Sequence, residues 1–239
     1  MPERATLLTA TEVVRSYPGA QGVLAVRGAS LSLAERDFVA LMGPSGSGKT
    51  TFIGVMSGLD APDEGEVRWR GEPVAEMSRE QRLELRRSRM GIVFQSFGLL
   101  PTLSAMENVE LPLRVSGAPL DEARDRAVGW LERLGLGDRL DNRTYELSAG
   151  QQQRVAVARA LVAEPALVLA DEPTGNLDSR ASDEIAALLR QVANEWGRAV
   201  VMVTHDAHVA SYADRIIFLK DGVIVEERRP DPSGNGRAD

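Results

Sequence analysis

Short apolar runs alternate with amphipathic stretches along most of the chain, and this pattern predicts an α/β fold. Residues 38–42, 166–170 and 199–203 are continuously apolar, which is typical of strands buried in a parallel sheet. Apolar residues recur at helical spacing between 121 and 134, and again at Ile185, Leu188, Leu189 and Val192. Near the C-terminus, two β-type runs flank Lys220-Asp221-Gly222 and predict a hairpin. We therefore expect a parallel sheet accompanied by helices.

Three other stretches are harder to place. Residues 78–89 are charged and predicted to be helical, and residues 66–71 alternate like an edge strand. The apolar segment Ser96–Leu113 is predicted to be a loop, because Pro101 and Pro112 limit helix formation. Such a loop is either a buried connector or a docking surface.

Composition narrows the functional classes. The 239 residues, of which 43% are hydrophobic, suit one large domain or a two-lobed one. A net charge of −7 argues against sequence-independent binding to nucleic acid, and we expect no nucleic-acid partner. The chain has no cysteine, which fits a reducing cytoplasm. Its first residues resemble neither a secretory nor a transit peptide, and no apolar run approaches the roughly 20 residues of a membrane span.

The segment Gly43-Pro44-Ser45-Gly46-Ser47-Gly48-Lys49-Thr50 predicts a phosphate-binding loop. It follows a predicted strand and precedes a predicted helix, so its glycines let backbone N–H groups surround phosphate oxygens at a helix N-terminus. Lys49 offers an ammonium to the β- and γ-phosphates, and the Thr50 hydroxyl is a candidate ligand for Mg²⁺. A glycine-rich turn that matches by chance would lack this context. The chain is predicted to bind a nucleoside triphosphate.

Other candidate residues sit at the ends of predicted elements. Asp171 and Glu172 end a buried strand, where a metal-side carboxylate and a general base for water would lie, although a solvated acidic turn is the alternative. His205 follows the next buried strand and is either a structural histidine or a γ-phosphate contact. Tyr17 is either a packing residue or a platform for adenine.

Ser148 and Gln151 have the spacing of a capping box and predict a helix N-terminus. This helix start is either a well-capped terminus alone or a second anion-binding site.

Together, these motifs resemble those of the ATP-binding-cassette ATPases, in the order that the family shows. The resemblance runs from Leu7 to about Glu227 and includes the loop at Gln95, the signature Leu147-Ser148-Ala149-Gly150-Gln151 and the loop Asn176-Leu177-Asp178. The segment from Ala170 to Ser179 is most similar to the branch that includes macrolide exporters, lipoprotein-release ATPases and the cell-division FtsE proteins.

The resemblance implies an ABC ATPase fold of the P-loop NTPase class. It implies an ATPase domain at 7–228, with a RecA-like parallel-sheet core and an antiparallel β subdomain (about 7–94 and 160–228). A helical subdomain is inserted at about 96–158, and residues 229–239 are expected to form a disordered tail.

The resemblance also implies the roles of the site residues. Two subunits would pair head to tail around two ATP molecules, each held by one subunit's phosphate loop and its partner's signature. Tyr17, residues 43–50 and Thr51 would contact ATP in one subunit, and Ser148, Ala149, Gly150, Gln151 and Asp178 would contact it from the partner. Thr50, Gln95 and Asp171 would hold Mg²⁺, while Glu172, His205, Gln95 and Lys49 would serve hydrolysis.

Position 149 departs from the family's usual glycine. An alanine there excludes the positive-φ conformations that glycine allows, so we expect a competent but slower site.

Three functional classes remain open. The favoured one is the motor of a membrane complex, lying on the cytoplasmic face of the membrane and docking on a separate permease near Ser96–Leu113. It would drive export or transmit force, with an FtsE-like division role as the alternative. A soluble ATPase acting on DNA or ribosomes is disfavoured, since about 100 residues separate the phosphate loop from the signature. A catalytically dead module would usually lack Glu172 or His205, and both are present.

Overall fold

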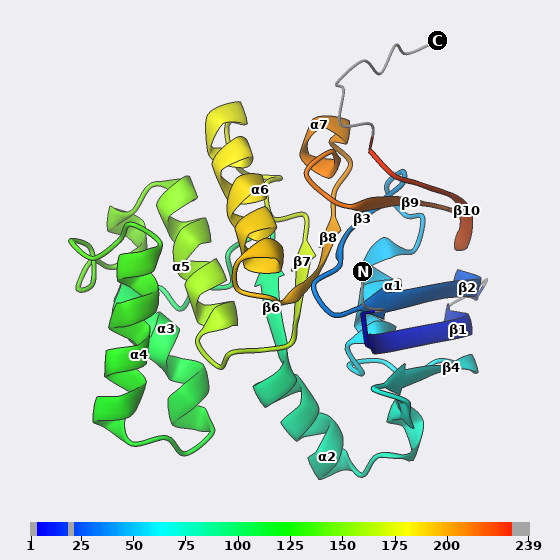
Figure 1. Ribbon diagram of the computed structural model, residues 1–239, viewed down its shortest axis with the longest axis horizontal. Coiled ribbons are helices and arrows are strands. Elements are labelled where there is room, and N and C mark those ends of the chain that lie inside the picture. Colours follow the sequence, from blue (N-terminus) through cyan, green and yellow to red (C-terminus); the bar gives the residue numbers. More distant parts are fainter. Residues whose placement is uncertain (1–3, 19–21, 231–239) are drawn as a thin grey trace.

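Strands form two sheets, of six and four strands, in the part of the chain that the computed structural model describes, residues 4–18 and 22–230 (Figure 1). The larger sheet has the order β10-β9-β3-β8-β7-β6, and its strands are parallel except for β10. Its strands are β3 (Phe38–Met42), β6 (Met90–Phe94), β7 (Leu167–Asp171), β8 (Ala199–Val203), β9 (Arg215–Lys220) and β10 (Val223–Arg228). The three apolar runs and the C-terminal hairpin are therefore confirmed as strands.

The continuous apolar runs are explained by burial on both faces. In β3, Phe38 and Ala40 pack with helices on one face, while Val39 and Leu41 pack toward the other sheet. One face is covered by α5 (Ala149–Leu161), α6 (Ser179–Asn194) and the short α7 (Ala207–Ala210), and the other by α1 (Lys49–Met56). A strand with no solvated face has no reason to alternate between apolar and polar residues, which is why these strands are continuous apolar runs in the sequence.

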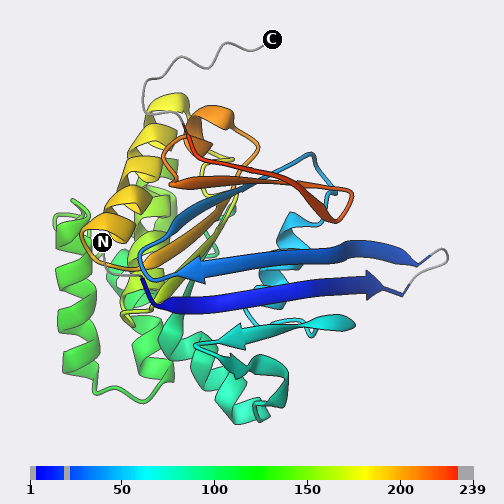
Figure 2. The same cartoon turned by 45° about the vertical axis from the view of Figure 1, so that its right-hand side comes forward.

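The smaller sheet is antiparallel, with the order β2-β1-β4-β5. Its strands are β1 (Thr6–Tyr17), β2 (Val23–Ala34), β4 (Glu64–Trp69) and β5 (Glu72–Pro73). Figure 2 shows β1 and β2 as a long hairpin that projects beyond the rest of the sheet. The end of β1 places Tyr17 in this projecting part.

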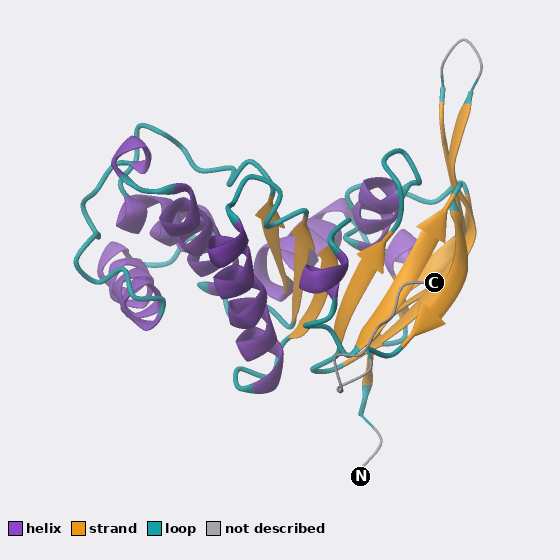
Figure 3. Ribbon diagram, turned by 90° about the horizontal axis from the view of Figure 1, so that it is seen from above, coloured by secondary structure: helices purple, strands orange, loops and turns teal. Residues whose placement is uncertain are grey.

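Three helices gather beside the larger sheet, away from the antiparallel sheet: α3 (Ala105–Val115), α4 (Leu120–Arg133) and α5 (Figures 1 and 3). The helix predicted at 121–134 is thus confirmed as α4. The charged stretch predicted at 78–89 forms α2 (Arg79–Glu84), which continues as a π-helical turn (Leu85–Arg89). Short 3₁₀ turns lie at Val74–Glu76 and Thr144–Glu146.

The prediction that Ser96–Leu113 is a loop is wrong in its second half, where α3 begins. A capping box starts this helix: the Ser104 hydroxyl accepts from the Glu107 N–H at 3.2 Å, and the Glu107 carboxylate accepts from the Ser104 N–H at 2.7 Å. Pro112 lies inside the helix. Burial of Met106, Val109 and Leu113 against the neighbouring helices compensates for the hydrogen bond that proline cannot donate.

The tail expected at 229–239 falls largely outside the described residues. Among the helices that the structure describes, none has the length and hydrophobicity needed to cross a membrane.

Asn108 on α3 holds the segment that precedes this helix. Its side chain is fully buried, its Oδ1 accepts from the Leu100 N–H at 2.8 Å, and its Nδ2 donates to the carbonyls of Leu100, Leu103 and Ser104. The apolar segment 100–104 is therefore a fixed loop with its backbone groups satisfied.

We expect Asn108→Ala to lower the free energy of unfolding by about 2–3 kcal/mol, because it leaves buried backbone groups of this loop unpaired. Urea denaturation followed by tryptophan fluorescence measures the change. The exposed Ser116, whose hydroxyl donates to the Pro112 carbonyl, is the control, and Ser116→Ala should change stability by less than about 0.5 kcal/mol. Equal effects of the two variants would contradict the role given to Asn108.

Candidate functional site

Four neighbouring parallel strands end together and bring the predicted motifs to one edge of the sheet. In register, Phe94 of β6 pairs with Asp171 of β7, Asp171 with Val203 of β8, and β8 with β3 through Leu41. The residues that follow these strand ends meet at the carboxyl edge, where open α/β sheets bind ligands. They surround a cleft of about 800 Å³.

Most of the predicted nucleotide contacts in the first half of the chain lie on this cleft. The cleft is lined, among others, by Tyr17, Ser45, Gly46, Gly48, Lys49, Thr50, Thr51, Gln95, Glu172 and His205. Gly43, Pro44, Ser47 and Asp171 are not among its lining residues. Val23 and Ala25 on β2 also line it, although nothing in the sequence pattern distinguished them.

The phosphate loop connects β3 to α1 and requires glycine at its ends. Gly43 and Gly48 have φ angles of 149° and 99°. A Cβ on Gly43 would lie 2.0 Å from the Leu219 carbonyl oxygen, and one on Gly48 would lie 2.1 Å from the Ala25 carbonyl oxygen. Both the positive φ and the close backbone therefore exclude side chains at these positions.

Lys49, the first residue of α1, is largely buried beneath the loop. Its Nζ donates to the carbonyl oxygens of Gly43 and Pro44, each at 2.9 Å. The ammonium is thus held at the helix N-terminus on the floor of the cleft, where positive charge and free N–H groups favour an anion.

Two acidic residues at the end of β7 contact different partners. The Thr50 hydroxyl donates to Asp171 Oδ2 at 3.0 Å, which joins the start of α1 to the end of β7. Glu172 Oε2 lies 2.9 Å from His205 Nδ1, within hydrogen-bond distance. Glu172 has a φ of 49°, unusual for a residue with a long side chain, and its N–H donates to the Val203 carbonyl at 3.1 Å. This turn directs the carboxylate into the cleft.

Gln95 follows β6 and is exposed at the mouth of the cleft. Its carbonyl accepts from Asn176 Nδ2 at 3.0 Å, so the loop after β7 holds the backbone of Gln95 in place. A Cβ on Gly175 would lie 2.7 Å from Gln95 Nε2. The absence of a side chain at Gly175 therefore makes room for the Gln95 amide.

Tyr17 is held from two sides. Its hydroxyl donates to Asp60 Oδ2 at 2.8 Å, and the Arg15 guanidinium lies over its ring, 5.0 Å from the centroid. Asp63 in turn accepts from Ser16 and Arg15, and the Ser16 hydroxyl and N–H hold the pKa of this carboxyl below its usual value. The ring is thus fixed at the edge of the cleft rather than packed in the core.

The signature residues lie elsewhere in the chain, in a hollow of about 260 Å³ that Ser148, Ala149, Gly150, Gln151 and Asp178 help to line. The predicted capping box is present: the Ser148 hydroxyl accepts from the Gln151 N–H, and Gln151 Oε1 accepts from the Ser148 N–H at 2.9 Å. Asp178 caps α6 by accepting from the Ala181 N–H at 2.8 Å.

Ala149 is the first residue of α5 and has a helical backbone. Position 149 thus does not need the positive φ that only glycine adopts freely.

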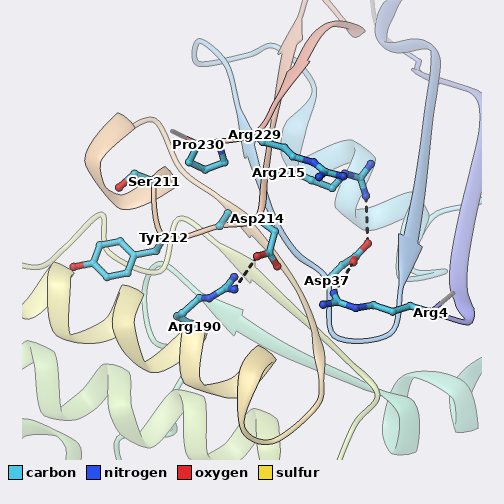
Figure 4. Close-up of a pocket in the computed structure, with 10 residues that line it drawn as sticks. Arg4, Asp37, Arg190, Ser211, Tyr212, Asp214, Arg215, Arg229 and Pro230 are labelled. Carbon is cyan, nitrogen blue, oxygen red and sulfur yellow. Dashed lines mark hydrogen bonds and ion pairs between the residues drawn. The ribbon is translucent and has the colours of Figure 1, made fainter. Parts of the chain in front are cut away.

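A further hollow, of about 680 Å³, lies at the opposite edge of the sheet (Figure 4). Asp37 and Asp214 directly precede β3 and β9 there, at the amino ends of these strands. Arg190 Nη2 donates to Asp214 at 2.7 Å, and Arg4 and Arg215 both pair with Asp37. These pairs tie β1, β3, β9 and α6 together, and the hollow takes no part in the nucleotide cleft.

Two contacts that shape the site gave no signal in the sequence. The Asn176 side chain donates to the Gln95 backbone carbonyl. The Tyr17 hydroxyl donates to Asp60, which is 43 residues away in the sequence. Arg15 and Tyr17 stand two apart on one strand and so share a face, which is the one pattern that could have paired them.

Comparison with known proteins agrees with this geometry. The sequence model of the family described as ABC transporter matches residues 26–175. The macrolide export ATP-binding/permease protein MacB of Syntrophobacter fumaroxidans is 46% identical over 224 residues, which are 92% of this chain and 31% of that protein. An uncharacterized ABC transporter ATP-binding protein of Methanocaldococcus jannaschii is 43% identical over 221 residues, 92% of this chain and 98% of that protein.

A solved structure is also similar: a dimeric ATP-binding cassette in a post-hydrolysis state, bound to ADP and Pi. Its TM-score is 0.86 at 40% identity, over 94% of this chain and 99% of that one. This chain spans about a third of the length of the MacB relative. With the cleft, the phosphate loop and the signature all in place, the chain belongs to the ATP-binding cassette family of ABC transporters.

Proposed function

We propose that this chain hydrolyses ATP in the cleft and so powers an export complex in the membrane. One observation carries the proposal: the in-register ends of β3, β8, β7 and β6 bring Lys49, His205, Glu172 and Gln95 around a single cleft. The names of the export relatives support the cellular role, and the ADP and Pi in the similar dimer support the reaction.

Different residues of the cleft bind the adenine and the phosphates of ATP. Tyr17 stacks on the adenine, and its ring is already held by Arg15 and Asp60. The backbone N–H groups of residues 43–51 surround the phosphates, which offer Lys49 charged acceptors in place of the carbonyls of Gly43 and Pro44.

The oxygen atoms beside the phosphate loop fit Mg²⁺. The Thr50 hydroxyl and Asp171 Oδ2 come from different elements and lie 3.0 Å apart, and the Gln95 amide lines the same cleft. Hydroxyl, carboxylate and amide oxygens are the hard ligands that Mg²⁺ prefers, with the remainder supplied by substrate phosphates. When bound, the ion supplies neutralisation of the charge that develops on the phosphates.

Glu172 is the general base of the proposed hydrolysis. It takes a proton from water as the water oxygen bonds to the γ-phosphorus and the bond to the β–γ bridging oxygen breaks, which yields ADP and phosphate. His205 Nδ1 lies 2.9 Å from Glu172, and its Nε2 donates to the γ-phosphate in the imidazolium form, in which both ring nitrogens carry hydrogen. Gln95 orients the attacking water.

The cleft is completed by a second copy of the chain. The hollow that contains Ser148–Gln151 and Asp178 is separate from the cleft in one subunit, and these five residues lie at the N-termini of α5 and α6. Head-to-tail pairing places this hollow over the partner's γ-phosphate, in the manner expected of a dimeric cassette.

The permease docks beside the same site, on the loop 96–104 and the neighbouring apolar surface. Phe94, Leu100 and Leu59 are exposed, and Phe94 and Leu59 line an apolar hollow of about 230 Å³ that also reaches Tyr17. Such a surface on an otherwise acidic chain is suited to a protein partner.

The chain would then lie on the cytoplasmic face of the membrane, with residues 7–228 as its ATPase domain and about 96–158 as the helical subdomain.

We expect Gly48→Ala to abolish binding of a fluorescent ATP analogue, because the added Cβ would meet the Ala25 carbonyl oxygen at 2.1 Å. Gly46→Ala is the matched control: its φ of 77° is also positive, but no atom lies within 4 Å of the added Cβ. This control should weaken binding by about tenfold at most, from backbone strain alone. Equal losses in the two variants would contradict the close packing at Gly48.

We expect Glu172→Gln to lower ATP hydrolysis by about 100-fold or more and to accumulate an ATP-bound dimer, since glutamine cannot accept the proton from water. Phosphate release and size-exclusion chromatography with Mg-ATP measure the two effects. Glu164→Gln is the control, because Glu164 also has a left-handed backbone (φ 52°) but lies outside the cleft. Near-normal turnover by Glu172→Gln would remove this residue as the base.

The transport role is tested by capture of tagged Glu172→Gln chain, with Mg-ATP, from detergent-solubilised membranes of the cell that makes it. We expect a permease to co-purify, and Leu100→Asp to abolish its recovery by placing a charge on the docking loop. Leu120→Asp is the control, because Leu120 is equally exposed but begins α4. Recovery of ribosomal or DNA-repair proteins without a membrane protein would overturn the transport role and leave the ATPase chemistry standing.

A further inference from the structure

Arg159 on the signature helix α5 reaches across to the loop that follows Gln95. Its Nη2 donates to the carbonyl of Phe97 at 3.0 Å, and its Nη1 donates to the carbonyl of Gly98. The signature at the start of α5 and the Gln95 loop are therefore joined by one side chain, more than 60 residues from its acceptors in the sequence.

The loop adopts an unusual backbone to make these contacts. Phe97 and Gly98 both have left-handed conformations, with φ angles of 62° and 61°. A bulky aromatic residue rarely adopts this conformation, and it persists only where its surroundings impose it. The two hydrogen bonds from Arg159 are contacts of the kind that can impose it.

The charge of Arg159 makes this attachment strong. Burial lowers the pKa of its guanidinium, and within the described residues no carboxylate offsets that burial. The two carbonyl oxygens are thus the compensation for a largely desolvated cation, and moving the loop away would leave the charge unpaired.

The other side of Gln95 is attached to a different element. Asn176, in the loop after β7, donates to the Gln95 carbonyl, and Phe94 just before it is paired into the sheet. Gln95 is therefore held on one side by β6 and the loop after β7. On the other side it is followed by the Phe97–Gly98 segment, which is fastened to α5.

We propose that Arg159 is a positioning residue that fixes Gln95 in the cleft by fastening the Phe97–Gly98 backbone to the signature helix. The proposal rests on the function proposed above for Gln95. Arg159 itself touches neither the cleft nor its contents. Its effect on hydrolysis must therefore pass through Gln95.

The test measures steady-state ATPase activity of Arg159→Met and Arg159→Lys in the full chain with Mg-ATP. We expect kcat to fall about tenfold in the methionine variant with KM for ATP within about twofold, because ATP is held by residues that Arg159 does not contact. The lysine variant, which keeps the charge but loses the paired donors, should lie between it and wild type.

Arg126→Met is the matched control. Arg126 lies in the same group of helices and also donates to a backbone carbonyl, that of Val162 at 2.7 Å, but it does not contact the Gln95 loop. We expect its kcat to stay within about twofold of wild type at a similar loss of thermal stability.

A double-mutant cycle with Gln95→Ala separates positioning from a general loss of stability. If Arg159 acts through Gln95, Arg159→Met should lower kcat little further in the Gln95→Ala background. In the Arg159→Lys variant, the rate of amide hydrogen exchange should also rise at residues 96–99 and stay unchanged in α5, relative to wild type.

Additive losses in the cycle, or an equal fall in kcat for the Arg126 and Arg159 variants, would overturn the proposal. Both results would leave the proposed function standing, provided that wild type hydrolyses ATP and Glu172→Gln does not. A wild-type chain without ATPase activity would overturn the proposed function, and this inference with it.

Discussion

The site depends on the parallel register of β6, β7, β8 and β3. These strands run side by side in one direction, so they all end at the same edge of the sheet. The residues that follow the strand ends are therefore neighbours. The hydrophobic burial of both sheet faces fixes this register, since a slip by one residue would exchange the side chains packed on α5 and α6 with those packed on α1. The geometry of the cleft is therefore a consequence of core packing.

Polar groups at this edge are paired with one another across elements. Lys49 is paired with backbone carbonyls, Thr50 with Asp171, and Glu172 with His205. Each pair joins segments far apart in the sequence or fixes a loop, so the site is organised before any phosphate competes for its donors. In the proposed function a triphosphate replaces only the carbonyl acceptors of Lys49, and the other pairs stay in place, so the groups need little reorganisation.

The buried strands and the phosphate loop could be predicted from the sequence because their physical requirements are local. An apolar run of five residues, or glycines placed before a lysine, can be recognised without knowing the partners. The role expected of Asp171 needed the phosphate loop as context, since the acidic pair alone is as consistent with a solvated turn. The role expected of His205 rested on the family resemblance, since alone it is as consistent with a structural histidine.

Helix α3 was missed because Pro112 opposes it locally, although the Ser104–Glu107 capping box is a local signal in its favour and its packing against α4 and α5 stabilises it. The ties made by Asn108, Asn176 and Arg159 could not be predicted either. Each ends on backbone carbonyls, and a carbonyl is present at every residue, so these contacts leave no spacing or residue type to recognise.

These ties hold the chain on both sides of Gln95. Phe94 is paired into the sheet, while Phe97 and Gly98 are fastened to α5, and Asn108 fixes the loop from Leu100 onward. Gln95 and Ser96 thus lie between a residue paired into the sheet and two residues fastened to α5, which itself packs on the sheet. The Gln95 side chain lines the cleft from a backbone that Asn176 also holds. Loss of either attachment is therefore expected to displace Gln95 in the cleft.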